Sequence, residues 1–419
     1  MAIPLGAKAG ELEELLSKAL KTSPKAVQAK SSAASARYRV KEAYGNYLPK
    51  VEWKYLYTDL SDVPSYQMAL PGLPPMEFSL FKRKFYQWEV GAQLPLFTGG
   101  RVYSLVKLRK AEAGAAEEEV KEVESQVASQ VAQDYYEVLK ARALVKAAEE
   151  ALNAAKEHYR VAKAFFEEGV VPRRDLLEAR VKVSQAEETL ERAKGYYRVA
   201  LEKLRSIVGD YSITPKGELS YTLPPVKESL EELIEKALKK RALLKAAEKG
   251  VKGAKAAEGL AKSSFAPQVG AQVAYHRTSQ YPMNGNFGYK SASLVISFPI
   301  FEGGKRFWKL REAKEEEVKA RAKLEEARRA VRLQVVAAYT ELQTARKRFE
   351  SAKRRVEEAR ELLRDSKERY KEQVGTSTEV VDAIAYLQQA ESSLASAAAD
   401  YYKALYRLRY AVGEKVNGF

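Results

Sequence analysis

One short motif occurs twice in the chain, and this duplication constrains the fold more than any other feature. The stretch QLPLFTGGRV begins at Gln93 and SFPIFEGGKR begins at Ser297, an offset of 204 residues. Further similar pairs recur at the same offset: Phe166 and Tyr370, Asp175 and Glu379, Leu176 and Val380, Ala179 and Ala383, Tyr197 and Tyr401, and Gly209 and Gly413. Two copies of one structural plan are therefore expected to pack together within a single chain.

The first copy is longer than the second between two shared landmarks. YLPKVEW from Tyr47 resembles FAPQVGA from Phe265 at an offset of 218, so the first copy has 14 extra residues. They belong to SDVPSYQMALPGLPPMEFS, a Pro-rich stretch that predicts a loop. The chain is thus predicted to consist of a first repeat at 1–209, an irregular equatorial linker at 210–229 and a second repeat at 230–419.

Each repeat predicts the order helix, strand, loop, strand, long helix, tip turn and shorter helix. In the first repeat these are a helix near 11–45, a β-hairpin at 47–97, a helix near 101–168, a turn near 169–172 and a helix near 173–208. In the second they are a helix near 230–264, a β-hairpin at 265–301, a helix near 305–372, a turn near 373–376 and a helix near 377–412. The long helices would extend roughly 100 Å and the shorter ones roughly 50 Å. An elongated molecule follows, in which each long helix packs against two shorter ones.

Four segments alternate apolar and polar residues with a period of two. The apolar positions are Val51, Trp53, Tyr55 and Tyr57; Tyr86, Trp88, Val90, Ala92 and Leu94; Val269, Ala271, Val273 and Tyr275; and Ala292, Leu294, Ile296 and Phe298. This pattern is typical of a membrane barrel, but also of a soluble antiparallel sheet with one wet face. Four strands cannot close a barrel, and lipid does not tolerate an open sheet edge. A barrel would therefore need several chains, and three would supply 12 strands with a water-filled interior.

Prolines and glycines mark the predicted junctions between helices and strands. Pro49, Pro95, Pro267 and Pro299 are expected at the four junctions, at matched places in the two hairpins. The pairs Gly99–Gly100 and Gly303–Gly304 are expected to form the turns that start the long helices. A phosphate-binding loop is excluded, because no Lys-Ser/Thr follows the glycines and no parallel sheet is predicted.

Composition excludes several classes of function. The chain has no cysteine, which rules out disulfides and thiolate metal sites. His158 and His276 are isolated along the sequence, and no metal, cofactor or catalytic set is predicted. The net charge of +16 fits either a solvated Lys/Arg surface or affinity for anionic lipid. Nucleic acid is not an expected partner, because acidic residues are mixed with the basic ones.

No stretch approaches 18 uncharged apolar residues, so no transmembrane helix is expected. The first residues contain no apolar segment of the kind found in signal peptides. Taken literally, the sequence is that of a cytosolic protein. It is equally compatible with a mature form whose leader has been removed.

Two further stretches, FFEEGVVPRRDLLEA and YKEQVGTSTEVVDA, are similar to stretches of a known family. Together with the doubled plan, they resemble the TolC-type outer-membrane factors of Gram-negative bacteria over about Glu11 to Gly413. The resemblance implies a mainly α fold with a β-barrel: a homotrimer with a 12-stranded barrel in outer-membrane lipid and a helical tunnel that spans into the periplasm. It implies a passive exit duct for a tripartite efflux pump or a type I secretion system, with a periplasmic adaptor (membrane fusion protein) and an inner-membrane transporter as partners. The alternative is a soluble, elongated coiled-coil scaffold.

The resemblance also implies sites at the helical tips. Acids at the second tip would narrow the tunnel, which places Asp382 and Glu379 at the aperture, with Asp175 and Glu178 as first-copy counterparts. Local helix chemistry offers another account of three of them. Glu379 completes the capping box TSTE, and Asp175 and Glu178 lie near a helix N-terminus. The candidates for tip structure or adaptor contact are Gly169, Val170, Arg173, Arg174, Gly375 and Thr376. Because Gln373 replaces the glycine of the first tip, the second tip turn is expected to differ in shape. Tyr370 is expected to serve in packing.

Overall fold

The computed structural model describes residues 9–283 and 285–414 of the chain. The chain divides into two compact units. The helical unit comprises Met1–Ser32, Glu117–Ala246 and Glu325–Phe419, and the strand unit comprises Ala33–Ala116 and Ala247–Leu324. Each unit draws segments from both sequence repeats.

The described residues contain eight α-helices, in the predicted order except that the first helix of each repeat is divided in two. They are α1 (Ala9–Thr22), α2 (Pro24–Gly45), α3 (Arg101–Glu167), α4 (Arg173–Val208), α5 (Leu230–Lys240), α6 (Ala242–Lys262), α7 (Lys305–Lys371) and α8 (Ser377–Val412). A short 3₁₀ turn, η1 (Ser263–Phe265), follows α6. No helix in the described chain is both long enough and apolar enough to cross a membrane.

The prediction of one continuous helix at the start of each repeat was wrong. In the first repeat the break lies at Ser23, directly before Pro24, whose ring cannot continue a helix but suits its first position. In the second repeat the break lies at Arg241, whose backbone is extended. The buried Arg241 guanidinium donates to the Tyr410 carbonyl and, at 2.9 Å, to Glu122. This second break is therefore set by contacts between distant segments.

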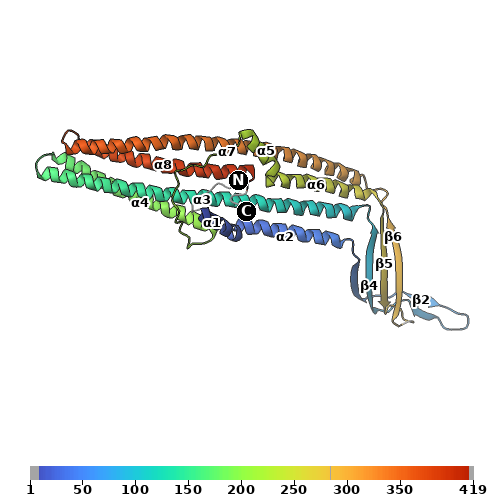
Figure 1. The fold of residues 1–419 in the computed structure, drawn as a ribbon. Helices are drawn as coiled ribbons and strands as arrows, with labels where there is room; N and C mark the ends of the chain where they lie inside the picture. The colour runs from blue at the N-terminus through green and yellow to red at the C-terminus, as the bar shows by residue number, and fades with distance from the viewer. Residues whose placement is uncertain (1–8, 284, 415–419) are drawn as a thin grey trace. The chain divides into compact units, whose positions relative to one another are not determined.

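The core of the helical unit joins helices from both repeats. Figure 1 shows α3 running beside α4 and α7 beside α8. Leu16, Val131 and Leu204 are fully buried in the largest apolar cluster. In the same cluster the ring of Tyr136 stacks on that of Tyr402, with centroids 4.5 Å apart. Because each buried side chain of this size contributes about 1.5–3 kcal/mol, the two repeats are held together by their shared core.

The linker at 210–229 contains no helix or strand, and side chains from both repeats bind its backbone. Arg142 of α3 donates to the Gly217 carbonyl at 2.8 Å, and Tyr402 of α8 donates to the Thr222 carbonyl at 2.8 Å. Glu11 of α1 accepts from the Gly217 amide at 3.0 Å. These bonds satisfy polar backbone groups that no regular structure pairs.

The strand unit contains one four-stranded antiparallel sheet in the order β1-β4-β5-β6. The strands are β1 (Lys50–Asp59), β4 (Lys84–Phe97), β5 (Gln268–Thr278) and β6 (Phe287–Ser297). The central pairing of β4 with β5 joins the first repeat to the second. The register places the predicted apolar positions within the four strands on one face, because directly opposed residues share a face. Trp53, Leu294 and Ile296 on this face are each more than 60% exposed.

The Pro-rich insertion is more ordered than predicted. It contains a second hairpin, β2 (Ser65–Met68) and β3 (Met76–Ser79), which projects away from the larger sheet in Figure 1. The sequence predicted only a loop here, although SYQM and MEFS alternate with the period of strands. The prolines lie between and beside these short strands, so they do not interrupt the pairing.

The junction glycines adopt the backbone conformation that the turns require. Gly99 and Gly100 precede α3 with φ of 59° and 84°, and Gly303 and Gly304 precede α7 with φ of 60° and 76°. Gly99 is also closely packed, because an added Cβ would lie 2.5 Å from the Cβ of Ala266. Side chains other than glycine would be strained at these positions.

Three of the four predicted junction prolines lie outside the strands. Pro49 and Pro267 directly precede β1 and β5, and Pro299 follows β6. Pro95 does not mark a junction as predicted, because it lies inside β4 next to an irregularity in the β4–β5 register. Proline cannot donate a ladder hydrogen bond, and a bulge accommodates that loss.

Candidate functional site

The two tip turns of the helical unit have the same backbone shape. Gly169 has φ of 74°, and Gln373 at the equivalent position has φ of 62°. The amide of Val170 donates to the Phe165 carbonyl at 2.8 Å, and the amide of Val374 to the equivalent Arg369 carbonyl at 3.0 Å. The expectation of a different second turn was therefore wrong. Gln373 adopts the left-handed conformation, which is costly for a residue with a Cβ.

Gly375 has a different role from Gly169. Its φ is not positive, but an added Cβ would lie 3.0 Å from the Cβ of Arg369 and 3.1 Å from the Tyr370 nitrogen. This glycine therefore allows the chain to pass close to the end of α7 before α8 begins.

The first-tip acids contact both their own helix and α8. Arg174 Nε donates to Glu178 Oε1 at 2.7 Å, and Thr378 Oγ1 donates to Glu178 Oε2 at 2.9 Å. These two bonds lower the pKa of Glu178. Burial raises the pKa of Asp175, and the nearby negative charge of Glu178 raises it further. Glu178 thus links the two tips by a side-chain bond, whereas Asp175 does so through its carbonyl, which accepts from Ser377 Oγ at 3.4 Å.

A buried polar group lies directly behind the tips. His158 Nε2 is 2.9 Å from Ser377 Oγ, and its ring packs edge-on against Tyr370 at 4.9 Å. Burial, together with the positive charge of Lys367, lowers the pKa of His158 to about 4. Burial raises the pKa of Tyr370 to about 12. His158 is therefore neutral at neutral pH, and its isolation along the sequence does not extend to the structure. Tyr370 packs as predicted, against both His158 and Phe165.

The second-tip acids are exposed on α8. Thr376 Oγ1 accepts from the Glu379 amide at 3.3 Å, so the helix is capped, but the returning bond from the Glu379 side chain is not formed. Capping by Thr376 thus does not involve the Glu379 carboxylate. Asp382 lies near Lys182 of α4: burial lowers the pKa of Lys182, and the charge of Asp382 partly offsets this effect. Lys182 on the first helical hairpin therefore offsets part of the negative charge of Asp382 on the second.

A groove of about 610 Å³ runs between α4 and α8 beside these acids. Its lining residues are Arg173, Arg174, Leu177, Glu178, Val181, Lys182, Gln185, Thr378 and Val381. The arginines and the apolar Leu177, Val181 and Val381 line the groove together, a combination suited to binding another protein's helix. Arg174 pairs within its own helix.

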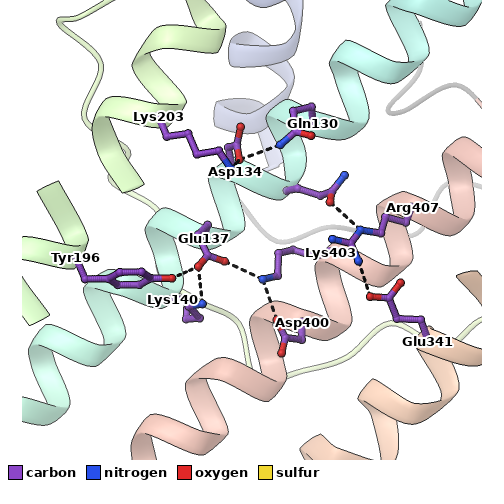
Figure 2. Close-up of polar contacts among 11 residues, drawn as sticks. Gln130, Asp134, Glu137, Lys140, Tyr196, Lys203, Glu341, Asp400, Lys403 and Arg407 are labelled. Carbon is purple, nitrogen blue, oxygen red and sulfur yellow. Dashed lines mark hydrogen bonds and ion pairs between the residues drawn. The ribbon is translucent and has the colours of Figure 1, made fainter. Parts of the chain in front are cut away.

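Nothing in the sequence indicated the half-buried ion cluster that joins α3 to α4 and α8 (Figure 2). Glu137 accepts from Lys403 at 2.8 Å, from Lys140 at 2.5 Å and from the Tyr196 hydroxyl. Burial alone would raise the pKa of Glu137, but these hydrogen bonds lower it to about 2. Glu137 and Lys403 are 266 residues apart, so no local pattern could connect them.

Within the described residues, no group of three or more His, Cys, Asp and Glu side chains could hold a metal ion. The chemistry that the tips offer is therefore charge and hydrogen bonding. The prediction from the sequence that the chain holds no metal site stays a prediction.

Paired long helices from two repeats, together with an antiparallel sheet whose apolar face is exposed, are the features that the sequence predicts for a subunit of an outer-membrane channel. The chain matches the model of the Outer membrane efflux protein family over residues 15–210 and 233–414. It belongs to this family.

Solved structures share the fold across nearly the whole chain. The structure of CusC, a protein that forms a transmembrane channel, has a TM-score of 0.81 and 18% identity, and the match covers 97% of this chain and 92% of CusC. VceC from Vibrio cholerae gives a TM-score of 0.78 at 16% identity, with 97% and 96% covered. The open-state channel MtrE from Neisseria gonorrhoeae gives 0.78 at 20% identity, with 96% and 89% covered.

Among sequences, Protein CyaE of Bordetella pertussis is 27% identical over 294 residues. The match covers 69% of this chain but only 62% of the length of CyaE.

Proposed function

We propose that three copies of the chain form a passive export duct in the outer membrane of a Gram-negative bacterium. The open edges of the sheet carry this proposal. β1 and β6 have no further strand partner among the described residues, so each leaves a row of unpaired backbone groups. Four strands are too few to close, and lipid does not tolerate open edges. Pairing β6 of one copy with β1 of the next would remove every edge and give a barrel of 12 strands.

The two faces of the sheet support the same arrangement. The face that carries Trp53, Leu294 and Ile296 would lie against lipid, where the transfer of apolar side chains is favourable. The opposite face carries Gln93, Gln272 and other polar residues and would line a water-filled lumen. The helices would continue this lumen as a periplasmic tunnel.

The helical tips would form the periplasmic aperture. Threefold symmetry would bring three copies of the exposed Asp382 carboxylate together around the axis, with Glu379 one turn away. Asp175 and Glu178 would contribute from the first tip, where Glu178 already links the two hairpins through Thr378. A ring of like charge in a narrow passage favours cations.

The groove between α4 and α8, which Arg173 and Arg174 line, would receive a helical hairpin of a periplasmic adaptor. An inner-membrane transporter would supply the energy, and the duct itself would hydrolyse nothing. The duct would serve a tripartite efflux pump, in keeping with the family name, or a type I secretion system. Both would use the same tunnel.

The test is the mass of the purified particle in mild detergent. We expect three chains per particle and loss of solubility when the detergent is removed. A stable monomer would contradict the shared barrel, and a dimer would indicate a closed barrel of eight strands filled by side chains. A particle that stays soluble without detergent would support the elongated coiled-coil scaffold instead.

A further inference from the structure

A row of ionisable side chains crosses the polar face of the sheet, one from each strand. Lys54 on β1 lies directly opposite Glu89 on β4. Glu89 lies opposite His276 on β5, and His276 lies opposite Tyr289 on β6. Directly opposed residues of antiparallel strands share a face, so the four side chains lie on the face opposite Trp53 and Leu294.

His276 is the centre of this row. Its Nδ1 lies 3.4 Å from Glu89 Oε2, and its Nε2 lies 3.2 Å from Ser291 Oγ. Its ring stacks on that of Tyr289, with centroids 4.6 Å apart and planes at 18°. The Glu89 carboxylate lies over Gly91, where an added Cβ would be 3.2 Å from Oε1. The glycine therefore leaves the space that the acid occupies.

This geometry accommodates both protonation states of His276. In the neutral ring, Nδ1–H can donate to Glu89 while Nε2 accepts from the Ser291 hydroxyl. In the protonated ring, both nitrogens donate, to the same two partners. The His276 and Glu89 side chains are 27% and 32% exposed, so protons can reach them from water.

The charge of the polar face depends on this one residue. The face carries two lysines, Lys50 and Lys54, and two glutamates, Glu52 and Glu89. Their charges cancel, and β6 adds no charged group to this face. The face is thus formally neutral when His276 is neutral and carries one positive charge per chain when it is protonated. Arg277 and Lys290 lie on the opposite face by the same register.

We propose that His276 is a specificity-determining residue that makes the ion preference of the barrel depend on pH. The proposal rests on the proposed function, in which this face lines the lumen of a trimer. Histidine is the side chain that gains or loses its charge most readily near neutral pH. The groups that face it are Glu89 from β4 and Tyr289 and Ser291 from β6, with Lys54 of β1 beyond Glu89. When His276 is protonated, three imidazolium groups surround the lumen and favour anionic solutes; when it is neutral, this preference is lost.

The absence of cysteine from the chain allows a direct test. Ser293 lies on the polar face two residues along β6 from Ser291, and Ser293→Cys places one thiol per chain beside the row. The rates of reaction with a sulfonate-bearing and a trimethylammonium-bearing methanethiosulfonate are measured on the reconstituted protein at pH 8 and pH 5.5. The ratio of the two rates reports the local potential, because the ionisation of the thiol affects both reagents equally.

We expect the anionic-to-cationic rate ratio to rise about three- to tenfold on acidification, as a unit charge about 8 Å away in water would produce. In the double variant with His276→Gln, the ratio should match that of the parent at pH 8 and stay constant down to pH 5.5. The agreement at pH 8 shows that the barrel is intact. A ratio that stays flat in the Ser293→Cys parent, or that rises equally in the double variant, would overturn the proposal.

A matched variant separates this proposal from the proposed function. Leu294→Cys lies on the apolar face one residue away and should not react with either charged reagent. If the thiols at positions 293 and 294 react equally, the faces do not separate lumen from lipid, and the proposed function itself fails.

Discussion

Replacing Glu137 should remove a large part of the electrostatic link between the two repeats. Its side chain is 21% exposed and is bound by Lys140, Lys403 and Tyr196, which lower its pKa from 4.5 to about 2. Each unit of pKa shift corresponds to about 1.4 kcal/mol, so the charged form is worth roughly 3 kcal/mol to the folded state. Glu137→Gln keeps the shape and removes the charge. It should therefore lower the free energy of unfolding by about 2–3 kcal/mol at pH 7.

The pH dependence gives the sharper test of this reasoning. A carboxyl group whose folded pKa is depressed stabilises the protein above its ordinary pKa, and that stability is lost as pH falls through the folded value. The parent should therefore lose its advantage over Glu137→Gln between about pH 5 and pH 2. For a chain of 419 residues, about 3 kcal/mol corresponds to roughly 3 °C in Tm at pH 7. Circular dichroism of the purified protein in detergent follows the helical transition.

Glu157→Gln is the matched control. Glu157 lies on the same helix and pairs with Arg160 at 2.8 Å, but both side chains are more than half exposed. Exposed pairs of this kind contribute little, so its Tm should equal that of the parent at every pH. An equal loss in both variants, or a Glu137→Gln deficit that persists unchanged at pH 3, would refute the assignment of the stability to the Glu137 cluster.

Three further outcomes follow from the structure. Asp382→Asn should abolish block by a trivalent cation added from the periplasmic side of a planar bilayer; a parent channel that is not blocked would leave Asp382 as a solvated helix residue. Leu294→Arg should lower the stability of the folded protein by roughly 2–4 kcal/mol if the side chain faces mid-bilayer lipid, whereas Ser293→Arg should be tolerated. Equal Tm values for the two variants would place both faces in water. Gln373→Gly should stabilise the second tip by about 0.5–1 kcal/mol, because glycine accepts positive φ without strain. Gly169→Ala should destabilise the first tip. The opposite order of the two Tm values would contradict the equivalence of the two turns.

The sequence predicted what depends on local periodicity and on the repeat. The boundaries of α4 and α8 agree with the predicted 173–208 and 377–412, and the four strands of the large sheet lie where alternation placed them. The break before Pro24 was visible in the sequence and was missed. The break at Arg241 was not visible, because it depends on a carbonyl of α8 that is 169 residues away.

At the candidate site, too, features set by local sequence were predicted and features set by distant contacts were not. The tip acids were located by likeness to a family, and their place at an aperture stays a prediction; Glu379 and Asp382 are exposed, whereas Asp175 and Glu178 are half-buried. The contacts between the two hairpins were not predicted: Lys182 lies on the other hairpin from Asp382, and Ser377 bonds to His158 across 219 residues. Sequence spacing specifies neighbours on one helix, whereas contacts between helices depend on how the two repeats are packed.

The two repeats and the two compact units divide the chain along different lines, and this affects the order of folding. β4 of the first repeat pairs with β5 of the second, and Tyr136 of α3 stacks on Tyr402 of α8. While only the first half of the chain has emerged during synthesis, neither unit can be completed, and the apolar faces of α3 and α4 remain uncovered. A nascent chain in this state is prone to aggregation. We therefore expect the apolar faces of the first half to need protection until α8, the last helix described, is made and covers them.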